Sequence, residues 1–111
     1  MRGSECNMDN IYVIVKSKST GISSMTKIRD IAFDMYEKEL ILISRDTGEI
    51  FASIELNFNP KTEEMSSIVA KLVNKYIKQS HGEGVVITTG DFINNLIDFG
   101  GIGNKVTNIR F

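Results

Sequence analysis

Alternation of apolar and polar residues predicts strands over most of the first half of the chain. Residues 50–58 alternate strictly, with five apolar side chains on one face and Phe51 among the polar side chains of the other. Residues 28–36 show a similar alternation. Residues 11–15 and 40–43 are short runs that are apolar on both faces. We therefore expect four strands before the first helix, with the two short runs buried within a sheet.

Apolar residues spaced three and four apart after Pro60 predict one long amphipathic helix. Asn59 suits the N-cap position and Pro60 the first helical position. Acidic residues in the first turns and lysines towards the end complement the helix dipole. The helix is expected to end near Ser80, before Gly82 and Gly84.

The last third of the chain predicts a strand, a short helix and a final strand. Residues 85–88 form a short apolar run, and residues 106–111 are the candidate last strand. Between them, Asp91 can cap a helix that Gly100 and Gly101 would end. The order β-β-β-β-α-β-α-β predicts an α+β fold with a mainly antiparallel sheet of four to six strands, one long helix and one short helix.

We expect a single domain over residues 10–111, with one continuous core. Residues 1–9 are expected to be a flexible N-terminal segment, and Met1 to Ser4 have the character of an expression-vector leader, with Met8 as an alternative start. The core is predicted to contain twelve residues: Val13, Val15, Ile31, Phe33, Leu42, Ile54, Leu56, Ile68, Leu72, Ile77, Val86 and Leu96.

Composition places the chain among ordinary globular proteins. Of its 111 residues, 41% are hydrophobic and 24% charged, so wholesale disorder is not expected. The single cysteine, Cys6, cannot form an internal disulfide. No apolar run approaches the roughly 18 residues of a membrane helix, and no signal peptide precedes the first strand. These features predict a cytoplasmic protein with no membrane contact.

Charge is unevenly distributed, although the net charge is only −1. Between residues 11 and 29 there are four basic residues and no acidic one. The loop expected at 16–24 adds hydroxyl groups and a glycine to its lysines, and such groups contact phosphate. This pattern predicts a nucleic-acid or phosphate contact through Lys16, Lys18, Lys27, Arg29 and Lys105. The alternative is a solvated loop whose charges protect a strand edge.

Lys105 belongs to a glycine-rich segment, residues 100–105. The segment has two interpretations: a backbone cradle or Gly-x-x-Gly clamp for phosphate, or a helix stop followed by a turn. A cradle usually follows a strand and opens a helix, whereas this segment follows a helix, which favours the turn. Phe51 likewise is either an exposed aromatic that stacks on a ligand or a residue on a second, covered sheet face.

Catalytic and metal motifs are weakly represented. His81, with Glu83 to orient it, is the one candidate general base, and its alternative is an exposed histidine at a helix end. One histidine and one cysteine cannot complete a closed zinc site. The sequence therefore predicts no metal and no cofactor, and it favours a protein that is not an enzyme.

Three hypotheses for function follow. The first is a non-enzymatic binding module or regulator that contacts nucleic acid through the basic loop, and it requires the basic residues to converge on one surface. The second is a protein–protein interaction or homodimeric assembly protein that uses an exposed strand edge or apolar patch. The third is a small enzyme that uses His81 with a carboxylate, and it requires His81 to line a pocket beside an acid.

Overall fold

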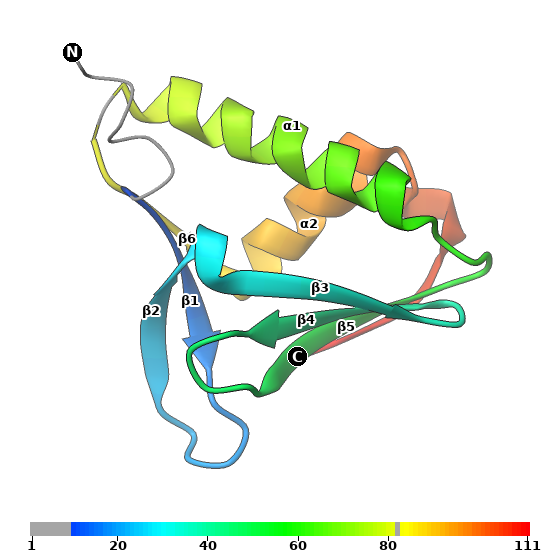
Figure 1. Cartoon of the computed structure of the whole chain (residues 1–111), viewed down its shortest axis with the longest axis horizontal. Coiled ribbons are helices and arrows are strands. Elements are labelled where there is room, and N and C mark those ends of the chain that lie inside the picture. The colour runs from blue at the N-terminus through cyan, green and yellow to red at the C-terminus, as the bar shows by residue number, and fades with distance from the viewer. Residues whose placement is uncertain (1–9, 82) are drawn as a thin grey trace.

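The computed structural model describes residues 10–81 and 83–111 (Figure 1). The predicted α+β class is confirmed. The strands and helices are, in order, β1 (Ile11–Lys16), β2 (Ser23–Lys27), β3 (Ile31–Tyr36), β4 (Glu39–Ser44), β5 (Ile50–Leu56), α1 (Thr62–Ser80), β6 (Val85–Thr88), α2 (Thr89–Gly100) and β7 (Val106–Arg110). Short 3-10 turns at Ile28–Asp30 and Gly103–Lys105 lead into β3 and β7.

Strand β2 is the element that the sequence pattern did not reveal. The alternation predicted a loop over residues 16–24 and a strand from residue 28. Instead, β2 pairs antiparallel with β1, and the 3-10 turn at Ile28–Asp30 separates it from β3. Met25 is the only apolar residue of β2, and it is 60% exposed, so the strand carries no apolar alternation. With β2 included, the described strands number seven rather than the four to six expected.

The strands form two sheets rather than one. The first has the order β2-β1-β6, with β6 parallel to β1. The second has the order β3-β4-β5-β7 and is antiparallel throughout. Both helices lie above the strands in the view of Figure 1, and α2 packs against α1, β1 and β6.

Most of the predicted core is buried in the structure. Eight of the twelve residues are buried: Val13, Val15, Ile31, Leu42, Ile54, Leu56, Leu72 and Leu96. The prediction for Val86 is wrong, because that side chain is 53% exposed. Its neighbour Ile87 pairs with Val13 and points inwards instead. The other three residues, Phe33, Ile68 and Ile77, are partly buried against the core.

Helix α1 begins slightly later than its sequence signals predicted. Asn59 and Pro60 precede the helix, whose first residue is Thr62. Lys61 occupies the N-cap position and makes no side-chain capping hydrogen bond. The predicted end is confirmed at Ser80, after which His81 adopts a left-handed conformation with a φ of 52°. A left-handed residue commonly ends a helix in this way.

Helix α2 follows β6 directly. The side-chain hydroxyl of Thr88 accepts a hydrogen bond from the backbone N–H of Asp91, at 3.1 Å. Thr88 is therefore the N-cap, and Asp91, the predicted cap, lies in the first turn of the helix. The helix ends at Gly100 as predicted, and Gly101 adopts a left-handed φ of 62°. A glycine suits that position because it has no Cβ to clash.

Candidate functional site

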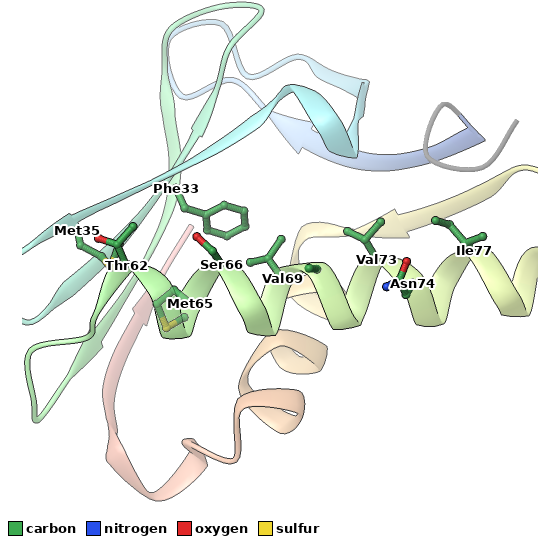
Figure 2. A pocket seen from close by; sticks show the side chains of 10 residues that line it. Phe33, Met35, Thr62, Met65, Ser66, Val69, Val73, Asn74 and Ile77 are labelled. Carbon is green, nitrogen blue, oxygen red and sulfur yellow. The ribbon is translucent and has the colours of Figure 1, made fainter. Parts of the chain in front are cut away.

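An apolar groove lies between α1 and β3 (Figure 2). Its volume is about 440 Å³. Seven of its lining residues are apolar: Phe33, Met35, Met65, Val69, Ala70, Val73 and Ile77. The other three are the neutral polar residues Thr62, Ser66 and Asn74. The lining therefore has no charged side chain to hold a charged ligand.

The groove exists because the apolar stripe of α1 is wider than the surface that the core covers. Leu72 and Tyr76 lie on the buried part of this stripe. Val69 and Ile77 are only partly buried and Ala70 is exposed, and all three line the groove. Helical spacing of three and four residues places the two groups side by side on one helix. The stripe thus serves the core along one side and the groove along the other.

The other wall of the groove is an edge strand. In the described chain, β3 pairs with β4 and has no strand on its other side. Its inward side chains follow the alternation of a strand, and Phe33 and Met35 are the two that line the groove. The backbone N–H of Ile31 donates to the carbonyl of Ile28, so another strand would pair with the free side of β3 beyond that group. Among the described edge strands, only β3 contributes to the lining.

The basic residues predicted to contact phosphate lie at different places on the β1–β2 hairpin. Lys16 pairs with Ser23 beside the hairpin loop, whereas Lys27 pairs with Tyr12 at the opposite end of β1. Four residues of extended chain separate the two ends, which corresponds to about 13 Å. Lys27 lies opposite Tyr12, and Tyr12 and Lys16 are four residues apart on β1. Lys16 and Lys27 therefore lie on the same, outer face of the sheet. Arg29 follows in the 3-10 turn after β2.

The loop that contains Lys18 already binds a carboxylate of the same chain. Glu49, from the loop between β4 and β5, accepts hydrogen bonds from the Ser17 hydroxyl at 2.9 Å and the Ser19 hydroxyl at 3.2 Å. The backbone N–H of Lys18 donates to the same carboxylate at 3.1 Å. These hydrogen bonds, led by that of Ser17, lower the pKa of Glu49. The loop therefore has the anion-binding groups that its sequence predicted, and Glu49 occupies them.

Lys105 lies far from this loop. Its backbone carbonyl accepts a hydrogen bond from the N–H of Asn57, which follows β5, whereas Glu49 precedes β5. The length of β5 therefore separates them, on the order of 20 Å. The Lys105 ammonium group lies 5.0 Å from the centre of the Phe58 ring. The glycine-rich segment around it ends α2 and turns into β7, as the second of its two interpretations proposed.

His81 lies at the end of α1 and is exposed. It borders a shallow hollow whose lining includes Lys71, Lys75, Lys78 and Phe99 and, among the described residues, no carboxylate. The acid that a catalytic histidine would need is therefore not beside it in this hollow. The described residues also contain no group of three or more His, Cys, Asp or Glu side chains suited to a metal. Phe51 is only 3% exposed, so it is not available to stack on a ligand.

Sequence reasoning missed the groove because it expected the long helix to bury its apolar stripe, and it placed Ile77, which lines the groove, in the core. The available signal was the width of that stripe, which extends past the buried residues to Val69, Ala70 and Ile77. The free edge of β3 had no comparable signal, because strand order depends on pairings between distant segments.

Comparisons with protein-family models, with curated proteins and with solved structures gave no match for this chain. Neither helix in the described part of the chain has the length and apolar character needed to cross a membrane.

Proposed function

We propose that this chain is a non-enzymatic binding module that recognises protein segments through the groove between α1 and β3. The observation that carries this proposal is that, among the described residues, an open apolar groove lies beside an edge strand with no strand paired to its outer side. An exposed apolar surface of this kind is a recognised feature of interaction sites. The free edge of β3 adds main-chain donors and acceptors, which an extended peptide uses to bind as an extra strand.

The lining favours one class of ligand. With ten neutral residues and no charged one, the groove offers apolar contact and three small polar groups. A charged metabolite would find no counter-ion there, whereas alternate apolar side chains of an extended segment would be well accommodated. The expected ligand is therefore a peptide segment with apolar residues at every second position.

Selection from a displayed library of random short peptides tests this proposal. Enriched peptides should show alternating apolar residues, and in NMR spectra they should shift the signals of β3 and of the groove side of α1. The variant Ala70→Glu should weaken their binding at least tenfold, because Ala70 is exposed and lines the groove. A carboxylate placed against an apolar ligand loses hydration without gaining a partner.

Ser67→Glu is the matched control. Ser67 is an exposed residue of the same helix and does not line the groove, and the substitution adds the same charge. Peptide affinity should stay within twofold of the original chain. The proposal is wrong if a chain shown to be monomeric enriches no peptide, or if both variants bind equally well.

A second candidate function, contact with nucleic acid, is favoured by one observation. Lys16 and Lys27 share the outer face of the β2-β1-β6 sheet with Tyr12, which is partly exposed and lies directly opposite Lys27. Aromatic rings and basic side chains on one surface are a known way to hold a single strand. The test is the absorbance ratio at 260 and 280 nm of protein purified with and without high salt and nuclease. Nucleic acid retained by the original chain but lost from Lys16→Glu would support this function, and its absence at low salt would contradict it.

A further inference from the structure

We infer that the segment which fills the groove is β3 of a second copy of this chain, paired antiparallel with the first through their free edges. This inference rests on the proposed function and names its partner. Symmetric pairs are the commonest assemblies of soluble proteins, and they need a surface that is complementary to itself. The free edge of β3 can be complementary to itself, because of the directions in which its side chains point and the position of its charged residue.

The alternation of β3 restricts how two copies can pair. In an antiparallel pair, residues directly opposite each other lie on the same face of the sheet. Ile31, Phe33 and Met35 face inwards, and Ala32, Asp34 and Tyr36 face outwards. Only registers that match inward with inward residues keep the apolar side chains together. The two such registers with the longest overlap place either Phe33 or Asp34 on the two-fold axis.

Charge separates these two registers. With Asp34 on the axis, the two Asp34 carboxylates would lie directly opposite each other, and like charges in that position are destabilising. With Phe33 on the axis, Asp34 lies opposite Ala32 of the second copy, and Phe33 faces Phe33. Ile31 then lies opposite Met35 of the second copy. The register centred on Phe33 is therefore the one we assign.

This pairing would also cover the groove. A two-fold axis perpendicular to the sheet keeps the inward faces of both copies on the same side, so the two α1 helices flank one joined sheet. Phe33 and Met35 line the groove and are only partly buried. In this register Phe33 would contact Phe33 of the second copy, and Met35 would contact Ile31 of the second copy. Because the lining of the groove is free of charge, the contact buries no unpaired ion there.

Light scattering on the full chain tests the assembly. The original chain should have the mass of two chains, and Met35→Lys should halve that mass, because an inward-pointing charge on an edge strand blocks pairing. Tyr36→Lys is the matched control, since Tyr36 is 67% exposed on the outward face of the same strand. It should keep the mass of two chains. Circular dichroism should show that both variants stay folded.

Disulfide trapping tests the register in a Cys6→Ser background. Under oxidation, a mixture of Ala32→Cys and Asp34→Cys chains should form a mixed disulfide, because these two positions lie opposite each other in the register centred on Phe33. A mixture of Ala32→Cys and Tyr36→Cys chains, which both keep Asp34, should stay largely monomeric on a non-reducing gel. Efficient linking of that mixture would overturn the assigned register, since those two positions lie opposite each other only when Asp34 is on the axis.

The outcomes distinguish this inference from the proposed function. A chain that is monomeric at all concentrations, yet binds displayed peptides in the groove, would overturn the second-copy inference and leave the interaction module intact. A monomer that binds no such peptide would overturn both. A dimer that Met35→Lys does not dissociate would place the contact elsewhere and overturn the inference.

Discussion

At the scale of single residues, Leu72 gives the most direct test of the core. Its side chain is fully buried on the inward side of α1. Leu72→Ala should lower the free energy of unfolding by about 2–5 kcal/mol, from lost apolar contact and the cavity left behind. Urea denaturation measures this change. Lys78→Ala, at an exposed position of the same helix, should change stability by less than about 0.5 kcal/mol. A loss below about 1 kcal/mol for Leu72→Ala would contradict this packing.

Glu49 gives stability a dependence on acid pH. Hydrogen bonds from Ser17, Lys18 and Ser19 lower its pKa in the folded state below that of the unfolded chain. The ionised form therefore contributes stability above the unfolded pKa, and this contribution is lost as the pH falls through the folded value. Side-chain carboxyl NMR titration should show the lowered pKa, and Ser17→Ala should raise it towards normal. An unchanged pKa in Ser17→Ala would contradict the assigned hydrogen bond.

At the scale of elements, Tyr76 links the two helices. Asn95 of α2 donates a hydrogen bond from Nδ2 to the Tyr76 hydroxyl of α1 at 2.7 Å. Tyr76→Phe should lower the free energy of unfolding by about 1 kcal/mol, because the hydrogen bond is lost and the ring stays. Thermal or urea unfolding at neutral pH measures this. No change at neutral pH would mean that the hydrogen bond adds nothing to the packing of α1 on α2.

The same tyrosine should make stability fall at alkaline pH. Burial raises the pKa of Tyr76, the hydrogen bond from Asn95 lowers it, and the charge of Asp91 raises it further. Because the folded pKa lies above the unfolded one, the neutral phenol contributes stability that is complete below the unfolded pKa and lost as the pH rises through the folded value. Tyr76→Phe should remove this part of the alkaline destabilisation. The same alkaline loss in both chains would assign it to other groups.

Elements with their own periodicity were predictable, and elements without it were not. The helical spacing of apolar residues predicted α1, and its buried residues lie on that stripe. The alternation predicted β5 as a strand, although Phe51 and Ser53 of its expected polar face are buried as well as Ala52 and Ile54. Four of the five residues of β2 are polar and the strand is held by pairing with β1, so nothing in its own sequence marks it as a strand. The four residues of β6 are all apolar or β-branched, so they show no alternation. The prediction therefore placed Val86 in the core, whereas Ile87, the next residue, is the one that points inwards.

At the scale of the whole molecule, one continuous core joins both sheets and both helices. We therefore expect a single cooperative unfolding transition. Three tyrosines report on separate parts: Tyr12 on the first sheet, Tyr36 on the second and Tyr76 on α1. Urea transitions followed by tyrosine fluorescence and by far-ultraviolet circular dichroism should coincide. Separate midpoints would contradict a single cooperative transition.

The sequence by itself determined the α+β class, the positions of the helices and most of the core, because these follow from periodicity and from glycine and capping residues close by in the chain. Tertiary structure alone decided which strands are neighbours. It placed Glu49 against the Ser17–Ser19 loop and separated Lys105 from Lys18. It also left the outer edge of β3, beside α1, without a paired strand in the described part of the chain. These features depend on contacts between segments far apart in the chain, and no local pattern of residues encodes such contacts.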